Sequence, residues 1–125
     1  MRDVIATKEG PQAIGPYSQA IRANGFIFVS GQVAIDPANQ QFIASDVAAQ
    51  TDRAIKNLGG ILKAAGSSLQ KVVRATVFLK NMDDFAAMNE VYGKHFSSAP
   101  PARSTVEVAR LPKDALVEID VIALA

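Results

Sequence analysis

The sequence predicts an α+β domain in which two α-helices pack on one face of a mixed β-sheet. Three observations lead to this class. The chain has 125 residues, which suits one domain, and no repeat or long linker divides residues 1–125. Its apolar content of 49% is enough to fill a core. Segments with alternating apolar and polar residues are interleaved with segments that have helical apolar spacing.

A β-hairpin is expected in the first quarter of the chain. Residues 26–30 are rich in β-branched and aromatic residues, and residues 18–23 would form the preceding strand. The dipeptide between them, Asn24-Gly25, is typical of a two-residue hairpin turn. Gly31 interrupts the apolar run, which predicts a β-bulge or the close approach of another segment. A further turn is expected at residues 36–39.

The clearest helix is expected over residues 46–65, with Ser45 or Asp46 as its N-terminal cap. Its apolar stripe follows helical spacing and consists of Ile55, Leu58, Leu62 and Ala65. Gly59 and Gly60 each cost about 1 kcal/mol of helix stability relative to alanine. Their presence therefore predicts that this helix packs closely on the sheet.

The second half of the chain is expected to contain a strand over 71–80, a helix over 81–96, and strands over 104–109 and 116–124. One face of the first of these strands would hold Val73, Ala75, Val77 and Leu79. The helix would share one face among Phe85, Met88 and Tyr92. The only histidine, His95, lies near the end of this helix, where a positive charge complements the helix dipole.

Only one face of such a sheet can be covered by two helices. The other face also needs to be removed from water if its side chains are apolar. A subunit partner is the natural cover, so the number of elements alone predicts oligomerisation.

The composition excludes several kinds of site. The chain has no cysteine, which rules out disulfides, thiolate metal sites and a cysteine nucleophile. One histidine rules out a His-rich metal site within the chain. The net charge of +1 gives no electrostatic reason to expect a nucleic-acid or membrane partner. The N-terminus lacks the apolar segment of a secretory signal, so a cytoplasmic location is expected.

A few polar residues could carry chemistry. Glu118 and Asp120 share one face of a strand whose other face is apolar. They are either partly hydrated or salt-bridged to a neighbouring strand, or they are cleft carboxylates that position water. Arg103 follows two prolines and is either a surface residue or a rigid anchor for a small carboxylate. Tyr17 after its turn, and the pair Ser30–Gly31 at a strand end, either pack structurally or face a ligand.

Four blocks resemble the motifs of the RidA family, also called YjgF, the reactive imine and enamine deaminases. They are IGPYSQA at residues 14–20, SGQ at 30–32, the stretch from PARS to RLPKD at 101–114, and VEI at 117–119. The blocks occur in the family's order, and the resemblance extends over nearly the whole chain.

The resemblance implies a fold similar to chorismate mutase and related to the ferredoxin-like fold, assembled as a homotrimer around a central barrel. Three clefts between subunits would hold the sites. The implied activity is that of a 2-iminobutanoate/2-iminopropanoate deaminase, which hydrolyses 2-imino acids to 2-keto acids and ammonia without a cofactor or metal. Its substrates arise from 2-aminoacrylate and homologous enamines that pyridoxal-phosphate enzymes release.

The resemblance also implies roles for individual residues. Arg103 matches the arginine that binds the substrate carboxylate, and Glu118 matches the glutamate that positions or activates water. Tyr17 matches a tyrosine of the cleft and completes the expected catalytic set. These three residues are the candidates for the reaction itself.

A second group would line the pocket and bind substrate with Arg103. Ser30 and Gly31 match residues near the imine, and Asn89 matches an asparagine that borders the cleft. Thr105 stands where the family commonly has cysteine, so a backbone contact to substrate there would survive.

Two other functions remain open at this point. The chain could be a non-enzymatic trimeric protein that binds a small carboxylate in the same cleft and acts as a regulator or chaperone. An RNA-directed nuclease has also been associated with the family. The net charge of +1 and the lack of a basic patch with aromatic residues weigh against nucleic acid as a partner.

Overall fold

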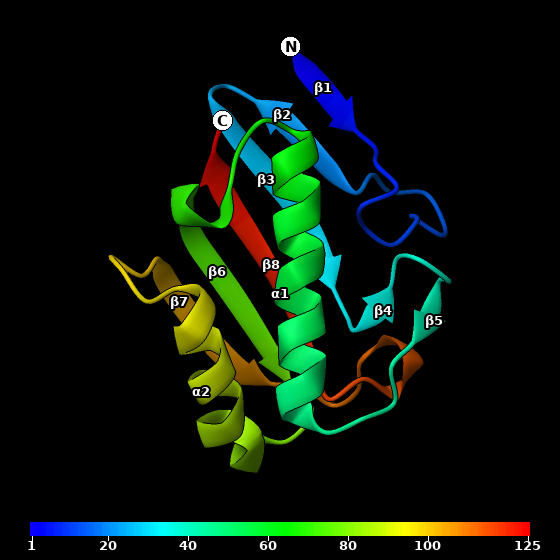
Figure 1. The fold of residues 1–125 in the computed structure, drawn as a ribbon, viewed down its shortest axis with the longest axis vertical. Coiled ribbons are helices and arrows are strands. Elements are labelled where there is room, and N and C mark those ends of the chain that lie inside the picture. Colours follow the sequence, from blue (N-terminus) through cyan, green and yellow to red (C-terminus); the bar gives the residue numbers. More distant parts are fainter.

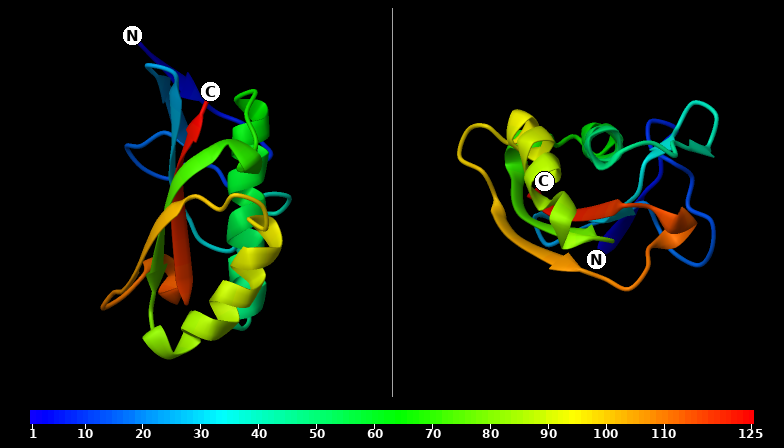
Figure 2. Two further views of the ribbon diagram at one scale, coloured as in Figure 1. Left: turned by 90° about the vertical axis from the view of Figure 1, so that its left-hand side faces the viewer. Right: turned by 90° about the horizontal axis from the view of Figure 1, so that it is seen from below.

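The computed structural model describes all 125 residues and consists of a six-stranded sheet with two helices on one side (Figures 1 and 2). The sheet has the order β1-β2-β3-β8-β6-β7. Its strands are β1 (Arg2–Ile5), β2 (Ala20–Ala23), β3 (Phe26–Gln32), β8 (Val117–Leu124), β6 (Val72–Leu79) and β7 (Ala102–Glu107). Only β6 and β7 pair in parallel, so the sheet is mixed, as predicted.

The helices are α1 (Val47–Ala64) and α2 (Phe85–His95), and each connects two strands of the sheet. A two-stranded ribbon of β4 (Ile35–Asp36) and β5 (Gln41–Phe42) lies beside the sheet around the turn predicted at 36–39. Short 3₁₀ turns occur at Leu69–Lys71, Met82–Asp84 and Pro112–Asp114. Neither helix combines the length and the apolar character that crossing a bilayer requires.

Local sequence signals place several elements as expected. Asn24 and Gly25 have φ values of 52° and 82°, which produce the predicted turn between β2 and β3. The Asp46 side chain accepts a hydrogen bond of 2.9 Å from the backbone N–H of Ala49 and so caps α1. The cap satisfies one of the free amides at the start of the helix, which stabilises it by about 1 kcal/mol.

The core lies between α1 and the inner face of the sheet. The predicted apolar stripe of α1 is buried, and Ile55, Leu58 and Leu62 are fully inaccessible to water. They pack on the alternate residues of β8 that face inward, which are Val117, Ile119, Val121 and Ala123. Fully burying each large aliphatic side chain contributes roughly 1.5–3 kcal/mol, so this layer fixes α1 on the sheet.

The two glycines of α1 differ from the prediction in what they contact. A β-carbon at Gly60 would lie 2.5 Å from the backbone oxygen of Glu9, in the N-terminal segment. A β-carbon at Gly59 would lie 3.4 Å from Leu69. Both glycines are therefore closely packed, as predicted. The segment that packs on Gly60 is the N-terminal loop and not the sheet, so the predicted partner is wrong for this residue.

The predicted face of β6 is wrong at one position. Val73 is 39% exposed, whereas the preceding Val72 is buried. The pairing with β8 shifts between Val72 and Arg74, and this bulge turns Val73 to the outer face. The residues from Ala75 onward keep the predicted alternation, and Ala75, Val77 and Leu79 are fully buried.

The outer face of the sheet has no helix across it (Figure 2). Large apolar side chains that are 41–61% exposed lie on its strands, namely Val4, Phe28, Val106 and Leu124. Val4 pairs with Ile21, and Ile21 with Phe28, so an apolar row crosses β1, β2 and β3. The expected uncovered face is therefore present and is apolar in part.

Candidate functional site

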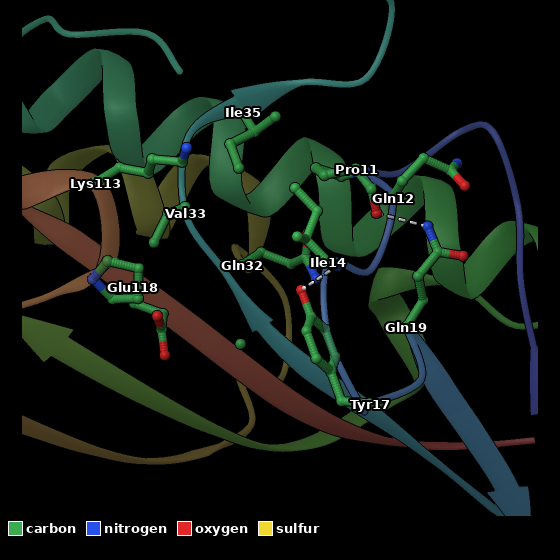
Figure 3. A pocket seen from close by; sticks show the side chains of 12 residues that line it. Pro11, Gln12, Ile14, Tyr17, Gln19, Gln32, Val33, Ile35, Lys113 and Glu118 are labelled. Carbon is green, nitrogen blue, oxygen red and sulfur yellow. Dashed lines mark hydrogen bonds between the residues drawn. The ribbon is translucent and has the colours of Figure 1, made fainter. Parts of the chain in front are cut away.

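A cavity of about 360 Å³ lies at the edge of the outer face, where three segments meet (Figure 3). The segments are the loop at 11–19, the end of β3 with the residues that follow it at 31–35, and residues 112–118. Tyr17, Gly31 and Glu118 are among the twelve lining residues. The structure thus brings together three of the residues that the sequence selected.

The Glu118 side chain lies across the backbone of Gly31. A β-carbon at Gly31 would be 2.5 Å from Glu118 Oε2 and 2.9 Å from its carboxyl carbon. Gly31 stands within a pairing irregularity of β3 and β8 between Val29 and Gln32. The predicted bulge and close approach are both confirmed, and the approaching group is the candidate catalytic carboxylate.

The environment of Glu118 favours its neutral form. Burial raises the pKa of Glu118, and the negative charge of Asp120 raises it further. Burial also raises the pKa of Asp120, although contacts with Thr76 and the charge of Arg74 oppose the shift. No side chain or backbone group of the chain donates a hydrogen bond to the Glu118 carboxylate. A carboxyl group with a raised pKa can both give and take a proton closer to neutral pH.

Tyr17 and Ser30 are both tied to the loop before β2. The Tyr17 ring is half exposed, and its hydroxyl accepts a hydrogen bond of 3.4 Å from the backbone N–H of Ile14 (Figure 3). The Ser30 hydroxyl donates to the backbone oxygen of Ser18 over 2.6 Å, so its proton holds the loop in place. The Ser30 oxygen retains its capacity to accept.

Gln19 is a residue of this region that the sequence reasoning did not select. It is 5% exposed, and its amide nitrogen donates to the backbone oxygens of Pro11 and Thr7 at 2.7 and 2.9 Å. Its amide oxygen accepts from the Thr7 backbone N–H at 2.6 Å. The side chain therefore fixes one wall of the cavity, and its place in the motif at 14–20 was the available signal.

Arg103 lies in a second group of candidate residues, on β7 beneath α2. Its Nη1 donates to Asn89 Oδ1 over 2.7 Å. Its guanidinium carbon is 4.6 Å from the ring centroid of Tyr92 and 5.5 Å from that of Phe85. The Thr105 hydroxyl, two residues further along the strand, is buried without a hydrogen-bond partner.

The two groups lie on opposite faces of the sheet. Arg103 pairs with Ala75 in the parallel ladder, and Ala75 belongs to the core under the helices. Glu118 pairs with Phe78, which lies between two inward-facing residues of β6 and so points outward. Tyr17, Ser30, Gly31 and Glu118 therefore form one group, whereas Asn89, Arg103 and Thr105 form another. Within one chain the structure does not bring them together.

His95 belongs to neither group, and its main contact differs from the prediction. Its Nε2 lies 2.8 Å from Asp52 Oδ1, so it links α2 to α1 and does not simply face the helix end. Lys56 Nζ is 2.9 Å from the same carboxylate. Burial alone would raise the pKa of Asp52, but these two partners outweigh burial and hold it below its usual value.

Comparisons with known proteins cover the whole chain. The family model described as Endoribonuclease L-PSP matches residues 7–125. A RutC family protein of Pyrococcus horikoshii is 51% identical over 123 residues, covering 98% of both chains. The 2-iminobutanoate/2-iminopropanoate deaminase of Mus musculus is 46% identical over 124 residues, covering 99% of this chain and 92% of the mouse protein.

Solved structures agree with the sequence matches. YyfA of Yersinia pestis, from the Rid protein family, superposes with a TM-score of 0.97 at 44% identity, covering 100% of both chains. TdcF of Escherichia coli, with bound serine, superposes with a TM-score of 0.93 at 39% identity, covering 98% of both chains. With these matches added to the four motifs and the mixed six-stranded sheet, the chain belongs to the RidA family, which also carries the names YjgF, L-PSP and RutC.

Proposed function

We propose that the protein hydrolyses 2-imino acids to 2-keto acids and ammonia. The observation that carries this proposal is the Glu118 carboxyl group, which lies against the Gly31 backbone in a cavity and has a raised pKa. Such a group is suited to moving protons between water and an imine nitrogen near neutral pH. The mouse relative, named for this activity, supports the assignment.

The complete site requires a second copy of the chain. Arg103 and Glu118 lie on opposite faces of one sheet, so a single substrate cannot touch both within one chain. The exposed apolar row on the outer face supplies a surface that a second copy would cover. A ring of three copies would repeat one such contact three times and form three equivalent clefts. Each cleft would combine the Glu118 group of one copy with the Arg103 group of the next.

In this cleft Arg103 would bind the substrate and Glu118 would transfer the protons. Arg103 binds the substrate carboxylate through two parallel N–H donors, and Asn89 holds the guanidinium from the other side. Glu118 takes a proton from water while the water oxygen bonds to the imine carbon, and it passes that proton to the nitrogen. The resulting carbinolamine loses its hydroxyl proton to the nitrogen, the C–N bond breaks, and ammonia leaves as the C=O bond forms.

The remaining candidates shape the cleft around this chemistry. In the proposed cleft the Ser30 oxygen would accept a hydrogen bond from water or the departing nitrogen, because its own proton is donated to Ser18. The Tyr17 hydroxyl would donate, because its oxygen accepts from Ile14. The small Gly31 leaves room for the Glu118 carboxylate to lie beside the water that it activates. The unpartnered Thr105 hydroxyl stands beside the anchor for the substrate carboxylate.

A coupled assay tests the proposal. A threonine dehydratase generates 2-iminobutanoate in the presence of excess amine trap, and the trapped adduct is measured with and without this protein. Wild type should divert imine to the keto acid, and Arg103→Ala should not. Arg22→Ala removes another half-exposed arginine, one that contacts the Ala65 carbonyl and lies in neither group, and it should retain full activity.

A second function remains as the alternative, because TdcF has been crystallised with bound serine. In this alternative the cleft binds a small carboxylate and the protein acts as a trimeric regulator or chaperone without turnover. Calorimetry with 2-ketobutyrate distinguishes the two. Glu118→Gln should keep keto-acid binding and lose turnover if the protein is a deaminase. Binding by wild type with no effect in the coupled assay would favour the alternative.

A further inference from the structure

The Arg103 guanidinium is held by one face of α2. Phe85, Asn89 and Tyr92 follow each other at intervals of four and three residues, which places them in a row on the helix surface. The two outer members present rings whose centroids lie 5.5 and 4.6 Å from the guanidinium carbon. Both distances are within the range at which a cation is attracted to a ring face. The middle member, Asn89, accepts a hydrogen bond from Nη1 over 2.7 Å.

Tyr92 presents the face of its ring to the guanidinium. The residue is 5% exposed, yet its hydroxyl oxygen is buried without a hydrogen-bond partner. A buried tyrosine hydroxyl normally finds a partner, and the group that comes closest to that role here is Arg103. Burial raises the pKa of Tyr92, although Arg103 opposes the shift, so the ring stays neutral at physiological pH. The ring also stacks on Phe96, with a centroid separation of 4.6 Å.

The guanidinium keeps most of its donors free. Of its five N–H donors, the one to Asn89 makes the single well-formed hydrogen bond within the chain, and the Tyr92 hydroxyl is a weaker neighbour. A carboxylate can receive two parallel hydrogen bonds only if it lies in the plane of the guanidinium. An arginine side chain has many rotamers, and fixing the plane before the ligand arrives removes part of the entropy cost of binding.

We propose that Tyr92 and Phe85 are positioning residues, whose rings fix the plane of the Arg103 guanidinium so that its free donors can receive a carboxylate. This inference rests on the proposed function for the identity of the ligand. The orientation of Arg103 itself is a property of the chain and can be measured without substrate. Because the rings act before chemistry, their loss should affect binding far more than turnover.

The test compares Tyr92→Leu and Phe85→Leu with Phe96→Leu as the matched control. Phe96 belongs to the same aromatic cluster and is similarly buried at 7%, but it does not contact Arg103. Removing either ring should raise KM for the imine by about 3- to 30-fold and change kcat by less than about twofold. The control should leave both parameters unchanged. Tyr92→Phe, which restores the ring, should return KM to within about twofold of wild type.

The second readout is the NMR order parameter of the Arg103 Nε–H bond in the ligand-free protein. It should fall in the two leucine variants and stay at the wild-type value in Phe96→Leu. Unchanged order in a folded Tyr92→Leu or Phe85→Leu variant would overturn the positioning role, whatever the activity. If Tyr92→Leu does not fold, the partly buried Phe85 supplies the same test.

The two readouts separate this inference from the proposed function. Loss of Arg103 order, together with a wild-type protein that hydrolyses no imine, would support positioning and reject the deaminase. An active wild type whose leucine variants lose kcat and keep KM would instead reject positioning. That result would show that the rings act on the chemical step.

Discussion

A substitution at Gly31 should affect the activity of this protein more than its stability, because the three atoms nearest to a β-carbon there all belong to the Glu118 side chain. In Gly31→Ala the new β-carbon would start 2.5 Å from Glu118 Oε2, and real β-carbon contacts rarely fall below 3.4 Å. The φ angle of Gly31 is not in the left-handed region, so the backbone accepts alanine without strain. The carboxylate must therefore move by about 1 Å.

This movement should cost little stability and much activity. The displaced atoms are the end of a flexible side chain, so we expect the free energy of unfolding to change by less than about 1 kcal/mol. A shift of about 1 Å in a catalytic group can lower the rate roughly 100-fold. We therefore expect Gly31→Ala to fold normally and to lose about two orders of magnitude in kcat/KM for the imine.

Gly60→Ala is the matched control, because its β-carbon would also start 2.5 Å from an oxygen atom. That oxygen belongs to the backbone of Glu9 and cannot move without shifting the N-terminal segment. The variant should lose roughly 1–3 kcal/mol of stability, although alanine favours the helix. Its folded fraction should lose much less activity than Gly31→Ala, because Glu9 lies beside the cavity wall and does not contact Glu118.

The assay pairs urea unfolding with the coupled imine assay on both variants. Wild-type kcat/KM in Gly31→Ala would contradict the prediction, because the position of Glu118 would then not matter. Unfolding of Gly31→Ala at the same urea concentration as Gly60→Ala would also contradict it, because the contact with Glu118 would then be rigid.

Three further predictions concern stability. Gly93 lies in a helix, and no atom lies within 4 Å of the β-carbon that alanine would add there. Gly93→Ala should therefore raise the free energy of unfolding by up to about 1 kcal/mol and leave activity unchanged. A lower free energy of unfolding in urea would show that the added methyl group is not accommodated. Since the pKa of Glu118 is raised on folding, wild type loses stability as pH rises through that pKa. Glu118→Gln should therefore melt at a higher temperature than wild type at pH 7, and the two should melt at the same temperature below about pH 4. A difference in melting temperature that does not change with pH would exclude titration of Glu118 as the cause. The pKa of Asp52 is lowered by Lys56 and His95 in the folded protein. The ionised carboxylate therefore adds to the free energy of unfolding above its unfolded-state pKa, and this stabilisation is lost as pH falls through its folded-state pKa. Asp52→Asn should lower the free energy of unfolding by up to about 1 kcal/mol at pH 7 and leave it unchanged near pH 2. An equal loss at both pH values would show that packing, and not charge, causes the effect.

The sequence predicted the elements that depend on local signals. The turn at Asn24-Gly25 requires only two residues with left-handed backbone. The cap at Asp46 requires one side chain and an amide three residues away. The alternation of β8 reports burial directly, because one of its faces is wholly inside.

Features that depend on distant partners were not predictable in the same way. Strand β1 was missed because its residues are largely exposed and its pairing with β2 spans a loop. The outward turn of Val73 follows from how β6 pairs with β8, about fifty residues away in the chain. The contact of Gly60 with Glu9 likewise joins two segments that no local pattern connects.

The candidate site shows the same division. Motifs could select Tyr17, Gly31, Arg103 and Glu118 by type and order. They could not show that Arg103 and Glu118 lie on opposite faces, because the register of β6 with both neighbouring strands decides this. Tyr92 was predicted to share one helix face with Phe85 and Met88, and its contact with Arg103 follows only from the packing of α2 over β7.

The most direct test of the account is complementation between two inactive variants. Arg103→Ala and Glu118→Gln are each assayed alone and then co-expressed in equal amounts, so that mixed oligomers form. If each cleft joins Arg103 of one copy to Glu118 of the next, about a quarter of the clefts regain both residues, and imine hydrolysis returns to about a quarter of the wild-type rate. A mixture as inactive as its components would contradict a site shared between copies.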